Sequence, residues 1–327
     1  MKPVTIVFCA VAILTLGAWM FPHATYSAAA PSGAPAQTVE AFFGRWDLTL
    51  KAPDREYPSW LELRQENGQL KAIMVSRWGN ARPLPIVEVA NGHLKFVSPK
   101  EEEERKDDMV FEGTLSGKHL TGTTTGPDGT PWTWTGVRAP SLKRLGAPIW
   151  EKPIPLFDGK DLAGWRMDKA NTPTIWKVEN GSLVTPGNGP DLINDSKFQD
   201  FKLHVEFNCG VNSNSGVYLR GRYEVQIETD SIDEPPSHHM GSVYGFLAPI
   251  PELPRKPEEW QTLDITLIGR TVTVAQNGHT IIDSKEIPGI TGGALDSHEE
   301  LPGPIYLQGG EKGRVAFRSI VITPAEK

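Results

Sequence analysis

The stretch Asn-Ser-Gly-Val-Tyr-Leu-Arg-Gly-Arg-Tyr-Glu-Val-Gln, residues 214–226, decides the fold that this sequence predicts. Two short alternating runs, 216–220 and 223–228, lie on either side of Gly221-Arg222. Alternation of apolar and polar residues is typical of a half-buried β-strand, and a glycine between two such runs is typical of a hairpin. The stretch therefore predicts two paired strands.

Polar side chains should gather on one face of this predicted hairpin. Successive side chains of a strand point to opposite faces, so Tyr218 and Arg220 are expected together on the face away from the aliphatic residues of their run. In the second run Glu224, Gln226 and Glu228 alternate with apolar residues in the same way. A sheet with one apolar face and one such polar face is either solvated on the polar side or forms the floor of a binding site.

The composition bounds the class of protein. A length of 327 residues is enough for roughly two domains. The hydrophobic fraction of 39% is enough for ordinary cores, so disorder is not expected outside the termini. The formal net charge is -7 and the Lys and Arg residues form no basic stripe, which argues against a nucleic-acid partner. The expected partner is a ligand that is neutral and polar, or weakly charged, and the sequence leaves the oligomeric state open.

The N-terminus has the layout of a secretory signal peptide over residues 1–30. Lys2 precedes an apolar run over 4–20, and Ala28-Ala29-Ala30 offers small residues for cleavage. A single membrane anchor is the alternative, because the run is close to the lower length limit for a span. The segment predicts an exported protein, periplasmic or extracellular, with no membrane insertion after cleavage.

The cysteines give no covalent support to the fold. Cys9 lies inside the apolar run of the signal, so the mature chain keeps Cys209 alone and has no internal disulfide. Cys209 is expected to be a small buried hydrophobe.

The first half of the chain, after a linker over 31–39, predicts a small antiparallel β-barrel over residues 40–138. Alternating runs separated by Asn-Gly, Ser-Gly and Asp-Gly turn signals indicate short paired strands. These runs are 46–50, 60–65, 70–76, 84–89, 94–97, 109–115, 119–125 and 132–137.

One local motif gives a hint to this barrel. Gly44-Arg45-Trp46 on the first predicted strand, with Arg138 after the last, is similar to the start and closing Arg of lipocalin-like barrels. In that family the Arg packs on the Trp. The resemblance concerns the fold and says nothing of a ligand.

The second half follows a proline-rich linker over 139–153 and predicts a jelly-roll β-sandwich over 154–324. No segment has a sustained 3.6-residue apolar period, so helices should be few and short. The strand candidates are 176–178, 182–185, 201–208, 216–220, 223–229, 260–268, 271–276, 280–284, 305–308 and 315–322. The whole chain is therefore predicted to be all-β.

The second half also carries a series of longer motifs. They are Leu156-Phe157-Asp158-Gly159 with Gly164-Trp165, Trp176-Lys177-Val178-Glu179-Asn180-Gly181, Asp200-Phe201-Lys202-Leu203, Asn214-Ser215-Gly216-Val217-Tyr218, Tyr223-Glu224-Val225-Gln226 and Gly303-Pro304-Ile305-Tyr306-Leu307-Gln308. In this order they resemble the 3-keto-disaccharide hydrolase family, exported bacterial proteins with a concanavalin A-like jelly-roll fold. The resemblance spans nearly all of 154–324.

The resemblance implies a small carbohydrate or glycoside as the partner and a defined chemistry. A ketone at C3 of a glucoside acidifies the C2 proton, so a base can remove it and expel the C1 substituent, after which water adds back. Such a site needs a base, a group that stabilises the enolate and an acid near the leaving group.

The predicted polar faces supply these groups. We expect Glu206, Arg220 and Glu224 to be catalytic, with Arg220 on the enolate and a carboxylate as base or acid. The expected substrate-binding residues are Tyr218, Gln226, Tyr244, Gln308 and His239. The competing interpretation is that Arg220 and Glu224 form only a cross-strand ion pair.

The loop 230–240 contains Asp230, Asp233, Glu234, His238 and His239, but its spacing matches no zinc signature. We therefore predict no metal and no cofactor, with a hard divalent cation such as Ca²⁺ on the carboxylates as the alternative. Trp165, Trp176 and Trp260 are expected in the core.

Three classes of function remain open at this point. The first is an exported enzyme that cleaves 3-keto-glycosides. The second is a non-catalytic carbohydrate-binding module or lectin, since jelly rolls serve widely as sugar-binding scaffolds. The third is a structural partner acting through the first barrel. Convergence of Glu206, Arg220 and Glu224 in one deep pocket would favour the enzyme.

Overall fold

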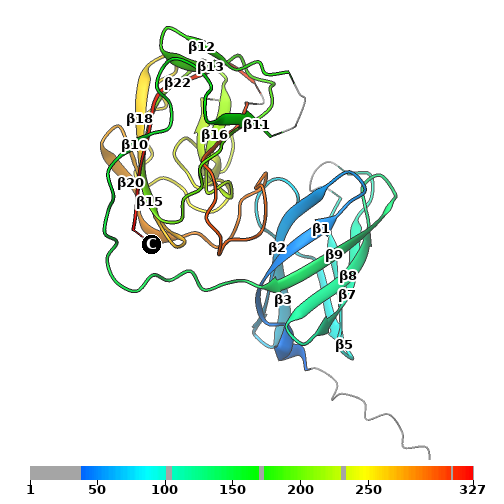
Figure 1. Cartoon of the computed structure of the whole chain (residues 1–327). Coiled ribbons are helices and arrows are strands. Elements are labelled where there is room, and N and C mark those ends of the chain that lie inside the picture. Colours follow the sequence, from blue (N-terminus) through cyan, green and yellow to red (C-terminus); the bar gives the residue numbers. More distant parts are fainter. Residues whose placement is uncertain (1–37, 101–104, 169–172, 230–232, 311, 327) are drawn as a thin grey trace, which may run out of the picture. The chain divides into compact units, whose positions relative to one another are not determined.

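The computed structural model describes residues 38–100, 105–168, 173–229, 233–310 and 312–326 (Figure 1). The predicted signal peptide, most of the linker after it, and Asp230 lie outside these residues. The described chain is almost entirely β-structure, as predicted, and within it no helix has the length and apolarity needed to span a bilayer. Its helical elements are the short 3₁₀ turns η1 (Val39–Phe42) and η3 (Pro236–His238).

In the part of the first half that the structure describes, nine antiparallel strands form one sheet. Its order is β4-β3-β2-β1-β9-β8-β7-β6-β5. Adjacent strands are consecutive in the sequence except for β1 and β9, and the consecutive strands β4 and β5 lie at opposite ends of the order. The sheet curls around its own core as a half-barrel (Figure 1). Its strands are β1 (Gly44–Lys51), β2 (Glu56–Glu66), β3 (Gln69–Val75), β4 (Arg82–Pro83), β5 (Ile86–Ala90), β6 (His93–Ser98), β7 (Met109–Ser116), β8 (His119–Thr125) and β9 (Pro131–Arg138).

The Trp and Arg of the lipocalin-like motif meet as predicted. The Arg138 guanidinium lies over the Trp46 ring, 3.8 Å from its centroid, and donates to the carbonyls of Ala41 and Phe43. The Trp46 indole N–H donates to the Phe42 carbonyl at 2.8 Å. Together these contacts hold η1 against the paired strands β1 and β9.

The second half forms a sandwich of two antiparallel sheets. In the described residues the first has the order β12-β13-β22-β15-β18-β19-β20, with β10 beside β22, and the second has the order β11-β14-β21-β16-β17. The strands are β10 (Ile154–Pro155), β11 (Trp165–Met167), β12 (Lys177–Glu179), β13 (Ser182–Thr185), β14 (Leu192–Asn194), β15 (Phe201–Cys209), β16 (Asn214–Leu219), β17 (Tyr223–Glu228), β18 (Trp260–Ile268), β19 (Thr271–Gln276), β20 (His279–Glu286), β21 (Tyr306–Leu307) and β22 (Val315–Pro324).

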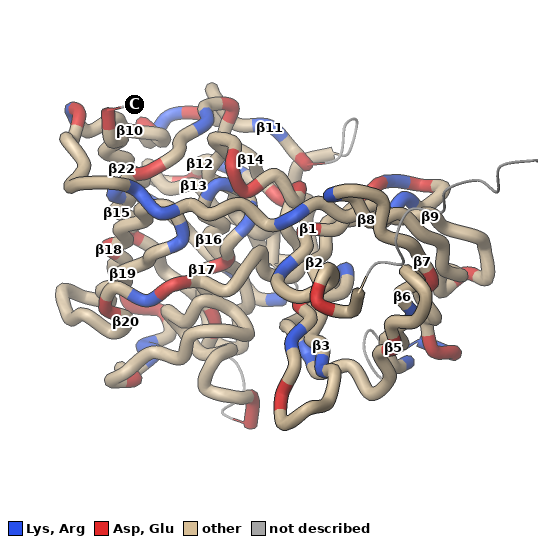
Figure 2. The backbone as a smooth tube through the Cα atoms, turned by 90° about the horizontal axis from the view of Figure 1, so that it is seen from below, with Lys and Arg blue, Asp and Glu red and all other residues tan. Residues whose placement is uncertain are grey.

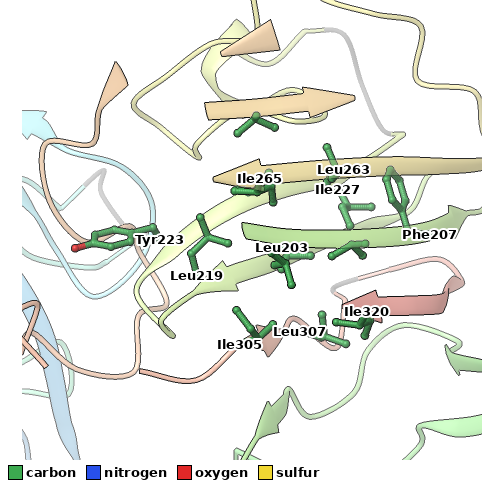
Figure 3. Packing of buried hydrophobic residues seen from close by; sticks show 14 of the residues in the cluster. Leu203, Phe207, Leu219, Tyr223, Ile227, Leu263, Ile265, Ile305, Leu307 and Ile320 are labelled. Atoms are coloured by element: carbon green, nitrogen blue, oxygen red, sulfur yellow. The ribbon is translucent and has the colours of Figure 1, made fainter. Parts of the chain in front are cut away.

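The apolar faces of these two sheets pack against each other. Figure 3 shows Leu203 and Phe207 of β15 and Leu263 and Ile265 of β18 facing the side chains of the second sheet, among them Ile227 of β17. Cys209 is buried in this core as a free thiol, which confirms its predicted role, and burial raises its pKa to about 12. Trp165 and Trp176 are buried as predicted, whereas the prediction for Trp260 is wrong, since it is 38% exposed and stacks under Arg318.

The strands that the sequence did not predict are the shortest. β4, β10, β11 and β14 contain two or three residues each, which is too few for alternation to be recognised. The predicted division into two domains stays a prediction, because residues 37–327 form one compact unit.

The first sheet contacts the segment 287–303, between β20 and β21, through buried polar groups. The Trp60 indole N–H donates to the Ile290 carbonyl at 2.9 Å, and the Ser297 hydroxyl donates to the Leu48 carbonyl at 2.7 Å. Arg45 forms an ion pair with the buried carboxylate of Glu299. Elsewhere, basic and acidic residues alternate along the described chain without a basic stripe (Figure 2).

We expect Asp47, beside this ion pair, to make stability depend on pH. Burial raises the pKa of Asp47 from 3.8 to about 7, helped by the neighbouring Glu299 carboxylate and opposed by Arg45. Between these values the folded protein holds a proton that the unfolded chain has released, so the free energy of unfolding falls as pH rises. Asp47→Asn should remove this dependence of stability on pH. Between pH 4 and pH 8 the free energy of unfolding of the variant should therefore rise by roughly 1–4 kcal/mol relative to that of the wild-type protein.

Urea unfolding of both proteins at these two pH values measures the difference. Asp283→Asn, at an exposed position, is the control and should run parallel to wild type. Parallel curves for Asp47→Asn as well would contradict the buried titration.

Candidate active site

A cavity of about 380 Å³ lies over the polar face of β16 and β17. Its lining combines carboxylates, phenols and amides with one Lys and one His. The lining residues are Trp78, Gly79, Asp191, Asn214, Tyr218, Glu224, Gln226, Glu228, Glu234, His238, Tyr244, Gly292, Gly293, Tyr306, Gln308 and Lys312.

This polar face is covered rather than solvated. Residues 241–247 run beside the free edge of β17, where the Gln226 N–H donates to the Ser242 carbonyl and the Tyr244 N–H to the Glu224 carbonyl, both at 3.0 Å. All six residues of β17 are buried, those of the polar row as well as those of the apolar row, and Glu224 is 4% exposed. Buried carboxylates need partners, so their contacts show how the site is held.

Glu224 is held by Tyr218, directly opposite it on β16. The Tyr218 hydroxyl lies 2.9 Å from Glu224 Oε2 and 2.9 Å from the Gly292 carbonyl, and can donate to either. When the Gln226 side-chain amide is turned over, which satisfies both of its polar atoms, its nitrogen donates to Glu224 Oε1 at 3.3 Å and to the Ser215 carbonyl at 3.2 Å. The carboxylate is therefore positioned from both sides.

A second phenol and carboxylate pair lies next to the first. The Tyr306 hydroxyl donates to Asp191 Oδ2 at 2.6 Å, and the Gly309 N–H donates to Oδ1 at 2.8 Å. The rings of Tyr218 and Tyr306 stack with their centroids 4.2 Å apart. Burial raises the pKa of both phenols well above 10, and the adjacent carboxylates add to the effect. Both hydroxyls therefore stay protonated and act as donors.

Two lining side chains have polar atoms available to a ligand. The Oε1 of Gln308 and the Nε2 of His238 are buried and have no hydrogen-bond partner among the described residues. His238 Nδ1 lies 3.0 Å from Glu234 Oε2, and its ring stacks on Tyr244 with centroids 4.4 Å apart. The His238 ring is thus oriented through Nδ1, while its Nε2 has no hydrogen-bond partner among the described residues.

Gly216 makes room for the Glu224 carboxylate. A Cβ at Gly216 would lie 2.3 Å from Glu224 Oε1, well inside van der Waals contact. The glycine in the Asn-Ser-Gly-Val-Tyr motif therefore has a packing role, since any other residue would displace the carboxylate.

The structure brings together five of the residues predicted to form the site. They are Tyr218, Glu224, Gln226, Tyr244 and Gln308, all of which line the cavity. Glu228, expected to extend the polar row, also lines it and pairs with Arg255 at 3.0 Å.

Glu206 does not reach this cavity. It lies on β15, whose polar row points outward from the opposite sheet of the sandwich, and it forms an ion pair with Arg318. The Arg318 hydrogen bond lowers the pKa of Glu206, with His204 contributing, which makes this carboxylate a weaker base. The sequence predicted its alternation correctly but not which side of the sandwich the alternating face occupies.

Arg220 also lies outside the cavity, so its predicted place beside Tyr218 is wrong. Strand β16 ends at Leu219, and Arg220 has a φ of +54°, which turns its side chain away from the strand alternation. It is fully buried and donates to the Tyr223 hydroxyl at 3.0 Å and the Gly269 carbonyl at 2.8 Å. No ion pair with Glu224 is found among the described residues.

His239 is the third predicted residue outside the cavity. Its Nδ1 lies 2.9 Å from Glu252 Oε1, and its Nε2 lies 2.8 Å from the Glu234 carbonyl oxygen. Its neighbour His238 lines the cavity instead. Among the described residues no group of three or more His, Cys, Asp or Glu side chains is arranged to hold a metal ion, and Asp230 lies outside them.

Several lining residues were not predicted from the sequence, among them Asp191, Tyr306, Trp78 and Lys312. Asp191 lies beside the three-residue strand β14, which is too short to show alternation, whereas Tyr306 lies in the predicted strand 305–308, two residues before Gln308 and so on the same face. Trp78 belongs to the first half, whose part in the cavity no local pattern could indicate. Tyr306 was within a quoted family motif, which was the available signal.

Comparison with known proteins identifies the family to which the second half of the chain is similar. Residues 152–323 match the model of the 3-keto-alpha-glucoside-1,2-lyase-like domain, and the chain belongs to this family. A curated relative, a 3-keto-disaccharide hydrolase of Bacteroides thetaiotaomicron, is 25% identical over 166 residues. The alignment covers 40% of this chain and 57% of that protein, so the chain spans little more than half of its relative's length.

Two solved structures from Parabacteroides distasonis, both provisionally assigned as glycosyl hydrolases, are also similar. One is 28% identical with a TM-score of 0.45 and covers 57% of this chain and 96% of its own. The other is 19% identical with a TM-score of 0.46 and covers 53% and 94%.

We predict that Gly216→Ala displaces the Glu224 carboxylate. The added methyl group needs the space that Oε1 occupies, so the hydrogen bond to Tyr218 should break, with a loss of about 1–3 kcal/mol in the free energy of unfolding. A crystal structure and urea unfolding of the variant measure both effects. Gly210→Ala, where the nearest atom is 3.3 Å away, is the control. An unmoved carboxylate in the variant would contradict the packing role.

Proposed function

We propose that this protein is an exported enzyme that cleaves 3-keto-glycosides by removal of the C2 proton and elimination of the C1 substituent, followed by hydration. The observation that supports it most is a buried carboxylate, Glu224, held by a phenol in a cavity lined with hydrogen-bonding groups. Membership of the 3-keto-alpha-glucoside-1,2-lyase-like family supports the same substrate class. Export is proposed from the signal-like N-terminus alone.

Glu224 is the proposed base. It takes the C2 proton, the electrons of the C2–H bond form the C1=C2 double bond, and the C1–O bond breaks toward the leaving group. The developing charge on the C3 oxygen needs a donor, and the ammonium group of Lys312, which lines the same cavity, is proposed for this role. Hydration then adds OH to C1 and H to C2, which returns a 3-keto sugar.

His238 is the proposed acid for the leaving group. Glu234 orients its Nδ1 side, and Nε2, without a protein partner in the described chain, can carry a proton to the leaving oxygen. Gln226 and Gln308 are proposed to bind sugar hydroxyls, because their amides line the same cavity.

The alternative function is a carbohydrate-binding module without catalysis. A lectin site is usually a shallow surface that needs no buried base, whereas here the carboxylate is 4% exposed and aligned by Tyr218. The expected convergence of Glu206 and Arg220 with Glu224 is not found, since only Glu224 lines the cavity. The enclosure of Glu224 favours the enzyme, and the two functions separate in one assay.

The test is release of the leaving group from 3-keto-glucosides by the purified protein. Glu224→Gln keeps the shape of the side chain but removes the base, and we expect kcat to fall by about 10²–10⁴-fold. Glu206→Gln is the comparison variant from the opposite sheet and should keep kcat within about threefold, because its carboxylate lies outside the cavity.

A large loss in Glu206→Gln with none in Glu224→Gln would reverse the assignment of the site. Binding of the 3-keto-glucoside without turnover by the wild-type protein would establish the lectin instead.

A further inference from the structure

A second cavity of about 540 Å³ adjoins the first. The two share the lining residues Trp78, Asp191, Gly293 and Tyr306, so they lie against the same side chains. The remainder of the second cavity is supplied mainly by the first sheet and its loops. Those residues are Asp54, Arg55, Glu56, Tyr57, Pro58 and Arg77.

The first sheet presents an exposed indole at this junction. Trp78 is 47% exposed, a larger fraction than that of Trp260, the other exposed tryptophan of the described chain, at 38%. The Arg55 guanidinium lies 5.3 Å from its centroid, and the ring of Tyr57 meets it edge-on at 6.3 Å. An exposed aromatic face held by neighbours is a preformed platform for a ring that carries C–H groups.

The platform is fixed relative to the proposed reacting groups. The Gly292 N–H donates to the Gly79 carbonyl at 3.1 Å, and a Cβ at Gly292 would lie 2.4 Å from that oxygen. The Gly292 carbonyl in turn lies 2.9 Å from the Tyr218 hydroxyl that holds Glu224. One short chain of contacts therefore connects Trp78 with the base.

The charges of the second cavity favour a neutral, hydroxyl-rich ligand over an anion. Arg55 and Arg77 are accompanied by the carboxylates of Asp54, Glu56 and Asp168. A mixture of donors and acceptors suits the hydroxyls of a sugar, which donate and accept, whereas an anion would be repelled by these carboxylates and by that of Asp191, which lines the same cavity.

We propose that the first half of the chain forms the leaving-group subsite, in which a second sugar ring stacks on Trp78 and hydrogen-bonds to Arg55. This proposal rests on the proposed function and assigns recognition of the leaving group to side chains of the first half of the chain. It also gives the first sheet a direct part in the site, because Trp78 and Gly79 line the cavity that contains Glu224.

The test compares two substrates that differ only in the leaving group. For a 3-keto-disaccharide, Trp78→Ala should lower kcat/KM by about 10-fold, equivalent to about 1.4 kcal/mol, whereas for methyl 3-keto-glucoside the change should stay within threefold. Arg55→Ala, which touches the second cavity alone, should show the same preference. Trp260→Ala, at an exposed Trp on the opposite sheet, is the control and should affect neither substrate. Equal losses on both substrates, or none, would overturn the subsite.

A binding measurement separates failure of this inference from failure of the proposed function. Calorimetry with an unoxidised disaccharide and with methyl glucoside needs no turnover. If no 3-keto-glycoside is cleaved, the proposed function fails, and tighter binding of the disaccharide that is lost in Trp78→Ala still supports the subsite. Binding that is equal for both ligands, or unaffected by Trp78→Ala, overturns it.

Discussion

The packing of two apolar sheet faces determines where chemistry is possible in this protein. Once β15 and β18 bury their aliphatic rows against β16 and β17, the polar rows of the two sheets must point to opposite sides of the sandwich. Glu206 and Glu224 therefore cannot meet, although their strands are close in sequence. The side that carries Glu224 is then enclosed by the segment 241–247 and by Gly292-Gly293, and enclosure turns a polar sheet face into a cavity.

Much of the fold could be predicted because alternation is a local property. The hairpin of β16 and β17, the meander of β1 to β9 and the stacking of Arg138 on Trp46 all follow from patterns within short stretches. The candidate site could be predicted only where it lies on such a strand, as Tyr218, Glu224 and Gln226 do. Asp191 and Trp78 come from segments without a pattern, and their place depends on how distant parts of the chain meet.

Arg220 shows why alternation stops being reliable at a strand end. The rule assumes extended backbone, and one residue with φ of +54° reverses the face on which the side chain emerges. The buried guanidinium then donates to the Tyr223 hydroxyl and the Gly269 carbonyl, and it does not line the cavity. Burial keeps the Tyr218 phenol protonated, so its hydroxyl can donate to the Glu224 carboxylate and hold it in place.

The carboxylate of Glu299 has a consequence for how the chain as a whole behaves. It is fully buried, and its partners come from both halves: Arg45 of the first sheet, and Arg270 and the Tyr223 hydroxyl of the sandwich. Separating the halves would leave this charge with fewer partners, at a cost that a surface ion pair would not have. The chain should therefore melt as a single cooperative unit, and neither half is a module that can be grafted elsewhere unchanged.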